Sequence, residues 1–487
     1  MKIAELTPAE RRVWDAFPRG SWVEFPETGE AASIRPEPER IVRAKVIRAL
    51  LLRGPSLDGE VPGLRLRRAY ISGPLDLQYA TVDHPISLRS CHFEHTPDFY
   101  GAQLRQLNLS GSFLPDLHAD TVRVSGVLRI TGCRIPGKVR LGGAKISGAL
   151  FLNDARLGRE DGAEADRGSL LLNHATVHDD IWGPGLVAHG TVVLTEATVD
   201  GSMNLDGADL RTPAGTALDG ENLSVGTKLS ARRVRTRGKM NLRGSSIPGH
   251  LDLTYARLSN PGGVALRASS CTIGELWLRE AAPIDGVVNL RRSQFDSIYA
   301  TPDVWPARIK LDGVTYASLA PPLPAEQRLD LLEREEDGYV PHAYEQLTAA
   351  YRRMGDDAAA RAVQLAKQRR HRATLSWYAK IWGHVQDATV GYGFRPTRAM
   401  AWLLALLVLG TVVYGVHRPG PVEPGKAPDF NSAVYTLDLL LPIIDFGQEK
   451  AFNPHGAYQW LAYLFIAAGW ILATTVVAGI TRSVSRQ

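Results

Sequence analysis

Apolar residues recur along residues 62–315 in a fixed eleven-residue frame. The frame reads apolar-x-apolar-x-x-small-x-apolar, and its clear copies begin at Leu75, Ile86, Val139, Leu150, Val192, Met203, Leu251 and Val288. Most neighbouring copies lie eleven residues apart, and a glycine such as Gly148, Gly201 or Gly249 often stands between them. An amphipathic helix would repeat apolar residues every three to four positions, so the frame predicts short strands instead.

Two copies of the frame make a coil of about 22 residues with four short sides, which is typical of a β-solenoid. The placement of a small residue two positions before an apolar residue resembles the pentapeptide-repeat family, although eleven-residue double steps replace strict fives. The resemblance implies an all-β right-handed quadrilateral β-solenoid, which we expect over residues 62–318. A segment that interrupts the frame near residues 157–169 is interpreted as a surface insertion.

The small position of the frame also accounts for cysteines. Alanine holds this position in most copies, and Cys91 and Cys133 hold it in two others. A free cysteine often packs as a small apolar residue, so we expect buried thiols without redox chemistry. Four histidines that are close in sequence have no metal-ligand spacing, and we expect them on a solvated face: His84, His92, His95 and His118.

Residues 1–61 are predicted to cover the open end of the first coil. An apolar stripe runs through Ile41, Ala44, Ile47 and Leu51, and Gly54-Pro55 forms a stop signal after it. This pattern predicts an amphipathic helix, and a solenoid needs such a cap on its exposed end.

Residues 319–390 are predicted to form a helical neck. Tyr344, Leu347, Tyr351 and Met354 fall on one helical face, and a second helical stretch follows Gly355. The pair resembles a single tetratricopeptide hairpin. One hairpin is not an array, so a packing element is favoured over a peptide-binding groove.

The end of the neck carries a basic run. Its members are Lys367, Arg369, Arg370 and Arg372. One interpretation is a solvated helix face. The run precedes an apolar segment, however, and basic residues beside a membrane attract anionic lipid headgroups, which are therefore expected partners.

Residues 391–487 are predicted to form a membrane domain. Two uncharged stretches, residues 399–416 and 458–480, are long enough to cross the hydrocarbon core. Arginine and lysine flank the pair on its outer sides, whereas residues 417–457 contain three such residues, Arg418, Lys426 and Lys450, against five acids. The positive-inside rule then predicts a two-helix protein of the bacterial inner (plasma) membrane with both termini in the cytoplasm.

Residues 389–393 read TVGYG, which is the filter signature of potassium channels. A filter works only between two membrane helices, where its carbonyl groups face an ion. No apolar stretch of spanning length precedes this copy. The motif is therefore predicted to lie on the cytoplasmic side, outside any ion path.

A second channel-like feature lies between the two predicted spans, at about residues 430–447. Phe430, Ala433 and Thr436 have the spacing of the pore helix of two-helix potassium channels, and the order helix, re-entrant segment, helix resembles that family. Residues 439–445 lack the alternating glycines of a filter, so potassium selectivity is not implied. The pore candidates are Thr436, Asp438, Pro442 and Asp445. The alternative interpretation places both aspartates in an extracellular loop facing water.

Three functions from different classes remain open. The first is a regulated pore or membrane sensor, which the channel resemblance implies would be a homo-oligomer, in particular a tetramer, with a cytoplasmic protein or ligand bound to the solenoid. The second is a membrane-tethered scaffold. The third is an enzyme, because the chain is similar in appearance to proteins labelled membrane-associated oxidoreductases.

The enzyme is the least favoured of the three. We find no dinucleotide-binding glycine motif, CxxC pair or haem motif, and we expect no catalytic residues, metal or cofactor. The formal net charge is only +5, from 56 basic and 51 acidic residues, which argues against nucleic acid as a partner.

Overall fold

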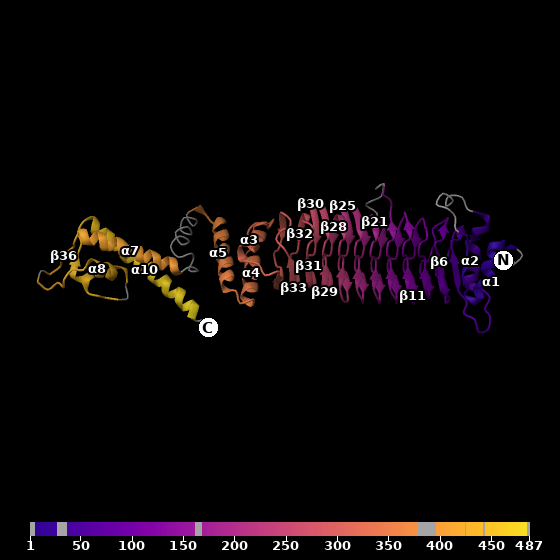
Figure 1. The fold of residues 1–487 in the computed structure, drawn as a ribbon, viewed down its shortest axis with the longest axis horizontal. Coiled ribbons are helices and arrows are strands. Elements are labelled where there is room, and N and C mark those ends of the chain that lie inside the picture. The colour runs from indigo at the N-terminus through magenta and orange to yellow at the C-terminus, as the bar shows by residue number, and fades with distance from the viewer. Residues whose placement is uncertain are drawn as a thin grey trace. The chain divides into compact units, whose positions relative to one another are not determined.

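The computed structural model describes residues 5–26, 37–160, 168–377, 396–423, 425–441 and 444–484. The chain divides into two compact units, Met1–Gly355 and Asp356–Gln487. The first contains a long stack of strands, and the second contains apolar helices (Figure 1). The TVGYG motif lies outside the described residues.

The predicted β-solenoid is confirmed. Residues 64–320 form parallel strands stacked in about 11 turns. Strands pair with those of the preceding and following coils, and these pairings form four ladders along the stack. Figure 1 shows the strands stacked side by side along this unit. We name each ladder after one of its early strands.

Each of the four ladders begins with short strands. The β3 ladder contains β1 (Val23–Glu24), β3 (Leu64–Arg67), β6 (Ile86–Arg89), β9 (Leu107–Asn108), β12 (Leu128–Arg129), β16 (Leu150–Phe151), β20 (Ile181–Trp182), β24 (Met203–Asn204) and β27 (Leu229–Ser230). The β5 ladder contains β5 (Thr81–Val82), β8 (Gln103–Leu104), β11 (Arg123–Val124), β15 (Lys145–Ile146), β19 (Thr176–Val177), β23 (Thr198–Val199) and β26 (Ser224–Val225). The β4 ladder contains β2 (Ile41–Arg43), β4 (Tyr70–Ser72), β7 (His92–Phe93), β13 (Arg134–Ile135), β17 (Arg156–Leu157) and β21 (Val187–His189). The β10 ladder contains β10 (Leu117–His118), β14 (Val139–Arg140), β18 (Leu170–Leu171) and β22 (Val192–Val193).

Longer strands extend two ladders at once in the later coils. Those shared by the β3 and β5 ladders are β29 (Ser246–Asp252), β31 (Thr272–Leu278), β33 (Gln294–Ala300) and β35 (Thr315–Ala320). Those that extend the β4 and β10 ladders are β25 (Asp209–Asp219), β28 (Arg235–Asn241), β30 (Arg257–Arg267), β32 (Asp285–Asn289) and finally β34 (Arg308–Lys310).

The strand register stacks like residues on like residues in the core. Leu150, for example, pairs with Leu128 on one side and with Ile181 on the other. The small position of the frame is buried as predicted, because Ala144 and Cys133 both lie inside the coil. All three cysteines are free and buried.

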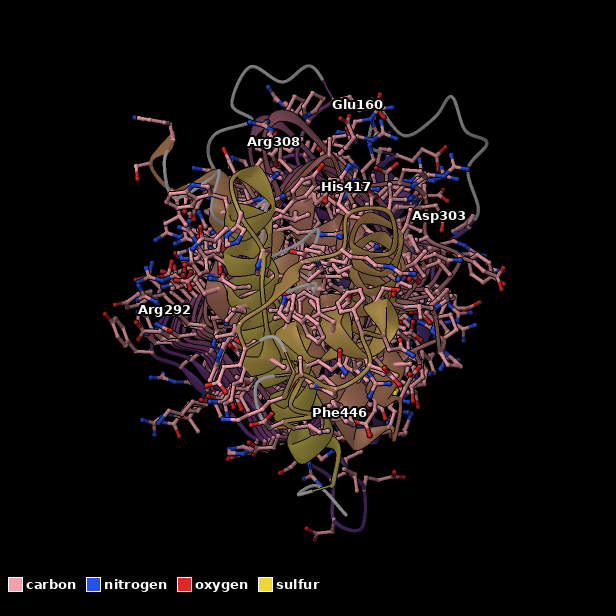
Figure 2. The ribbon with its side chains drawn as sticks, turned by 90° about the vertical axis from the view of Figure 1, so that its left-hand side faces the viewer. Glu160, Arg292, Asp303, Arg308, His417 and Phe446 are labelled. Atoms are coloured by element: carbon pink, nitrogen blue, oxygen red, sulfur yellow. The ribbon has the colours of Figure 1, made fainter. Side chains whose placement is uncertain are left out.

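The backbone turns sharply just before each small residue, a feature that the sequence frame treated as variable. Asp154, before Ala155, has a φ of 52°, and Arg292, before Ser293, has a φ of 57°. In the first of these turns the amide of Ala155 donates a hydrogen bond of 3.1 Å to the carbonyl of Leu152. Arg292 projects from the surface of the solenoid at such a corner (Figure 2).

The glycines between copies of the frame serve another purpose. Gly249 does not have a positive φ, but a Cβ atom there would lie 2.3 Å from the carbonyl oxygen of Thr227 in the adjacent coil. At Gly148 the corresponding distance, to the carbonyl of Gly126, is 2.8 Å. Glycine is therefore required at these corners by the close approach of neighbouring coils.

The N-terminal cap is more elaborate than predicted. The expected helix is α2 (Ala44–Arg53), with Ile47 and Leu51 buried. In the described residues before it lie α1 (Pro8–Ala16) and the short 3-10 helices η2 (Phe17–Arg19) and η4 (Pro38–Arg40). Strands β1 and β2 of this region pair directly with the first coil.

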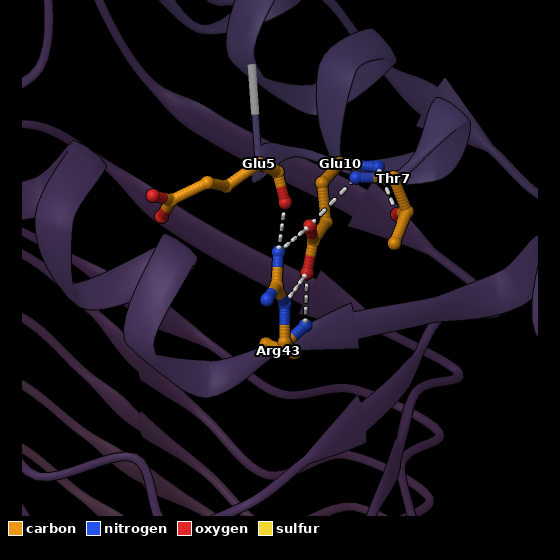
Figure 3. A network of polar contacts seen from close by, with 4 residues as sticks. All are labelled: Glu5, Thr7, Glu10 and Arg43. Carbon is orange, nitrogen blue, oxygen red and sulfur yellow. Dashed lines mark hydrogen bonds and ion pairs between the residues drawn. The ribbon is translucent and has the colours of Figure 1, made fainter. Parts of the chain in front are cut away.

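An ion pair joins α1 to β2 within the cap (Figure 3). The fully buried Glu10 carboxylate accepts hydrogen bonds from the Arg43 guanidinium, from the Arg43 amide at 3.1 Å and from the Thr7 amide at 3.0 Å. The Arg43 guanidinium also donates to the Glu5 carbonyl at 2.8 Å. Burial acts to raise the pKa of Glu10, but the hydrogen bonds and the charge of Arg43 outweigh it, so that the pKa lies below its ordinary value.

The last coil is covered by α3 (Ala325–Glu333) and α4 (Pro341–Arg353). Gln346 and Arg353 of α4 donate to the carbonyl of Tyr316 on β35, at 2.5 and 2.9 Å. The Tyr351 hydroxyl donates to the Leu323 carbonyl at 2.7 Å. The first half of the predicted neck is thus a C-terminal cap, and α3 was not predicted. Met354, just after the end of α4, is 42% exposed, whereas Tyr344, Leu347 and Tyr351 are buried.

The second unit contains five helices and a small antiparallel pair of strands in its described residues. These elements are α5 (Asp357–Ala373), α7 (Pro396–Val416), β36 (Gly420–Pro421), α8 (Ser432–Leu440), α9 (Gln448–Ala451), β37 (Phe452–Asn453) and α10 (Ala457–Val484).

One described helix is long and apolar enough to cross a membrane. It is α7, over Arg398–Val416, with a mean hydropathy of 2.2. The second predicted span is also helical, as part of α10, but its described apolar stretch, Ala457–Ala473, is shorter. A second crossing therefore remains a prediction.

Candidate functional site

The short helix α8 is wedged between α7 and α10 (Figure 1). A Cβ atom at Gly410 of α7 would lie 2.2 Å from Cγ2 of Thr436, and one at Gly469 of α10 would lie 2.2 Å from the carbonyl oxygen of Leu440. Glycine at these two positions therefore lets α8 sit directly against both long helices. With nine residues, α8 is about 14 Å long, which is too short to cross a bilayer.

Aromatic side chains fill the space around this wedge. Tyr414 of α7 meets Tyr435 of α8 edge-on, with 5.0 Å between ring centroids, and Phe465 of α10 lies 6.3 Å from Tyr414. The Tyr414 hydroxyl donates a hydrogen bond of 3.1 Å to the carbonyl of Tyr458. These contacts fix the three helices as one packed cluster.

The side-chain amides of Asn431, before α8, and Gln448, after it, form hydrogen bonds that fix the two ends of this helix and its flanks. The Asn431 side chain caps α8 by accepting from the amides of Ala433 and Val434, at 3.0 and 3.2 Å. The buried Gln448 side chain accepts from the Asn431 amide at 3.4 Å and donates to the Asp429 carbonyl at 3.0 Å. Sequence reasoning missed both residues, although an asparagine directly before an apolar helical stretch is an ordinary N-cap signal.

Asp438 makes hydrogen bonds to the segment that follows α8, here called the return segment, which runs from Ile444 to Glu449 in the described residues. Its side chain is buried, with 4% exposed. One carboxylate oxygen accepts from the amide of Phe446 and the other from the amide of Glu449, each at 2.8 Å. Within a single chain, this pore candidate therefore acts as an internal clamp that connects α8 to the start of α9.

Asp445 lies in the same segment but faces solvent. Its carboxylate accepts from the amide of Gly447 at 2.8 Å and forms an ion pair with Lys450. The hydrogen bond from Lys450, with a smaller effect from the Gly447 amide, lowers the pKa of Asp445. A carboxylate already paired with lysine has less free charge to attract a cation.

The two remaining pore candidates contribute little further geometry. Thr436 is buried against Gly410, and its hydroxyl donates to the Ser432 carbonyl at 2.8 Å. Pro442 lies outside the described residues. These four residues could line an ion path only in an assembly of several chains. That arrangement stays a prediction.

The outer faces of the two long helices are apolar and exposed in the chain. On α7 and α10 these residues are Met400, Trp402, Leu404, Val408, Leu409, Val412, Val416, Trp460, Tyr463, Leu464, Trp470 and Ile471. An exposed apolar surface of this extent marks a contact with lipid or with another protein.

The predicted basic run lies on the second half of α5. Arg369 and Arg370 are exposed, and Lys367 and Arg372 are partly buried. The helix is capped at its start by Asp356, whose side chain accepts from the Ala359 amide at 2.8 Å. Contact of this run with lipid headgroups stays a prediction.

The solenoid surface also gathers aromatic and cationic side chains. His250 stacks on Trp277 with 4.4 Å between ring centroids. The Arg279 guanidinium lies 4.5 Å from the ring centroids of both Trp277 and Tyr299. Such clusters of Trp, Tyr and Arg are common at protein interaction surfaces.

The solenoid cysteines that the sequence singled out are buried thiols. Burial raises the pKa of the Cys91 and Cys133 thiols to about 12, which keeps both protonated. Among the described residues, no group of three or more His, Cys, Asp or Glu side chains could hold a metal ion. His92 is partly exposed on the outer side of β7 and is stacked between Tyr70 and Phe113.

Comparison with known proteins gives no relative that could assign a function. No protein-family model, curated protein or solved structure matches this chain.

Proposed function

We propose that the chain is a membrane-anchored binding scaffold. In this proposal the second unit crosses the bacterial inner membrane twice, through α7 and α10, with both termini in the cytoplasm. The cytoplasmic solenoid, taken as a degenerate pentapeptide-repeat relative of right-handed quadrilateral form, presents its faces to a protein or ligand. The basic run on α5 supports the anchor by contacting anionic lipid headgroups.

One observation favours an anchor over a pore. Both aspartates between α7 and α10 already have partners within the chain. Asp438 accepts two backbone hydrogen bonds, and Asp445 is paired with Lys450. Many exposed apolar residues of the unit lie on the outer faces of its two long helices. That distribution suits a unit whose contacts are with lipid.

Membrane fractionation of the expressed full chain tests the anchor. The chain should remain in the pellet after alkaline carbonate washing and should float with vesicles in a density gradient. Release by carbonate would show a peripheral protein and contradict the proposal. Comparison of anionic and neutral vesicles, with Arg369→Gln/Arg370→Gln beside the wild type, then measures the part played by α5.

A second candidate function is a regulated pore. The wedge of α8 between Gly410 and Gly469 favours it, because a short helix between two membrane helices is the arrangement of two-helix channels. A homo-oligomer, in particular a tetramer, would place Asp445 and its equivalents around one axis. Ion flux from proteoliposomes, lost in Asp445→Asn, would support the pore over the scaffold.

The oxidoreductase alternative is not supported by any of the cofactor motifs sought in the sequence. An absorption spectrum of the purified protein would test it, since flavin, haem and iron–sulfur groups absorb visible light. A visible absorption band from a group that copurifies stoichiometrically with the chain would support the oxidoreductase alternative.

A further inference from the structure

A groove of about 670 Å³ crosses the face of the solenoid formed by the β5 ladder. It spans strands β5, β8, β11, β15 and β19. Its central residues are Arg105, Arg123, Ser125, Lys145, Ser147 and His178. Every one of these side chains is exposed.

The strand register brings the cationic residues together. Arg123 pairs with Lys145 on one side and with Gln103 on the other. Neighbouring strands lie about 4.8 Å apart, so the bases of these side chains are equally close. Arg105 follows Gln103 by two residues and therefore points to the same face of the sheet.

Two serines line the groove next to these cations. Ser125 and Ser147 follow Arg123 and Lys145 by two residues on adjacent strands. Their backbone amides are used within the solenoid, since they donate to Leu104 and Val124 at 2.9 and 2.8 Å. Among the described contacts of the chain, neither hydroxyl has a protein partner, so both can donate to a ligand.

The groove carries excess positive charge. Elsewhere on the solenoid, basic residues are paired with acids, as in Arg140–Asp120 and Arg243–Glu221. Within the described part of the chain, no ion pair joins Arg105, Arg123 or Lys145 to a carboxylate. Only Asp83 adds a negative charge to the lining, and at the opposite end the Nδ1 atom of His178 is held 2.7 Å from Asp200.

We infer that this groove binds the phosphate groups of a small di- or triphosphate anion. Two guanidinium groups and one ammonium group surround two hydroxyl donors, which is the donor set that phosphate oxygens prefer. The cations come from three consecutive strands, β8, β11 and β15, across roughly 10 Å. One carboxylate could not engage all three, whereas a chain of two or three phosphates could.

This inference deepens the proposed function, because it names a ligand class for the scaffold, and it rests on that function for its context. The two can fail separately. Anion binding is measured on the full chain in detergent micelles and does not depend on membrane insertion. Fractionation reports on the anchor whether or not the groove is occupied.

The test is isothermal titration calorimetry of the full-length protein with inorganic pyrophosphate and tripolyphosphate. Wild type should bind tripolyphosphate more tightly than pyrophosphate, and affinity should fall as salt concentration rises. The variant Arg123→Gln/Lys145→Gln should bind at least about tenfold more weakly, because two charge-assisted contacts are lost. Arg257→Gln removes an exposed cation from β30, on another face, and should bind as wild type does.

Two results would overturn the inference. One is the absence of tripolyphosphate binding by wild type at millimolar concentration. The other is equal affinity in wild type and Arg123→Gln/Lys145→Gln, with circular dichroism confirming that both are folded. Tighter binding of an acidic peptide than of tripolyphosphate, through the same two residues, would assign the groove to a protein partner and would also contradict the inference.

Discussion

The two units of this chain satisfy their backbone hydrogen bonds in different ways. In the solenoid the bonds pass from coil to coil, as from the Leu150 amide to the Asp180 carbonyl, so each coil depends on its neighbours. In the second unit the bonds close within each helix, and a few side chains decide how the helices pack. Changes in the solenoid should therefore act through its repeating frame, and changes in the second unit through single contacts.

The largest expected effect is at the cap, where the solenoid has no further coil to depend on. Arg43→Met leaves the fully buried Glu10 carboxylate without its cation, and removal of one partner of such a pair costs about 3–5 kcal/mol. Hydrogen exchange of the first coils should become faster. Glu10→Gln/Arg43→Met should recover part of the loss, and an equal loss in both variants would contradict the ion-pair account.

The same pair predicts a dependence on pH. Because the folded-state pKa of Glu10 lies below its ordinary value of 4.5, its stabilisation is present above that value and is lost as pH falls through the folded-state pKa. Wild type and Arg43→Met should therefore converge in stability in acid. Thermal melting of both proteins over the range from neutral to acidic pH measures this, and a gap that widens in acid would be inconsistent with it.

Overpacking of one coil should be the next largest effect. Ala144→Leu places a large side chain at a fully buried small position and should destabilise the solenoid by about 1–3 kcal/mol. Arg134→Leu, at an exposed position of β13, is the control and should be nearly silent. Equal shifts in melting temperature for the two variants would contradict the assignment of buried and exposed positions by the eleven-residue frame.

In the second unit the wedge can be disturbed without touching the solenoid. Gly410→Ala forces a Cβ atom against Thr436 and Phe465 and should loosen α8 by about 1–3 kcal/mol. Gly415→Ala, five residues later on α7, is a matched control, because its nearest neighbour would be Ser432 at 3.6 Å. Limited proteolysis of residues 425–453 in micelles should be faster only in Gly410→Ala.

A last pair of variants distinguishes the two aspartates, and the Asp445 variant should have the smallest effect of all. Asp438→Asn replaces one of two acceptor oxygens by a donor and should weaken the return segment by about 1–3 kcal/mol. Asp445→Asn removes only an exposed ion pair with Lys450, which solvent screens, so its effect on the segment should be smaller than that of Asp438→Asn. Hydrogen exchange of the Phe446 and Glu449 amides measures both, and faster exchange in Asp445→Asn than in Asp438→Asn would reverse their assigned roles.

The solenoid and the second unit also differ in how much of their structure the sequence predicts. The solenoid could be predicted because each coil repeats the same side-chain volumes, with Ala144 or Cys133 at equivalent positions. The left-handed turn at Asp154 could not, because many residue types occupy that position and its conformation is set by stacking. Strands β1 and β2 were also missed, since short strands at an end pair only because a coil is already there.

The candidate site was predicted in part. The apolar run after Phe430 indicated a short helix between two longer ones, and α8 is that helix. Its fixation by Gly410 and Gly469 depends on packing between segments far apart in the sequence, which no local pattern encodes. Asp438 looked like a free charge for the same reason, because its partners are backbone amides eight and eleven residues away.

Labelling of single cysteines in intact cells tests the membrane-anchored scaffold most directly. The native Cys91, Cys133 and Cys271 are buried and should not react, so they need not be replaced. Glu423→Cys, between α7 and α10, should be modified by an impermeant thiol reagent from outside, whereas the exposed Asp303→Cys on the solenoid should react only after lysis. Labelling of Asp303→Cys in intact cells, or protection of Glu423→Cys, would contradict the account.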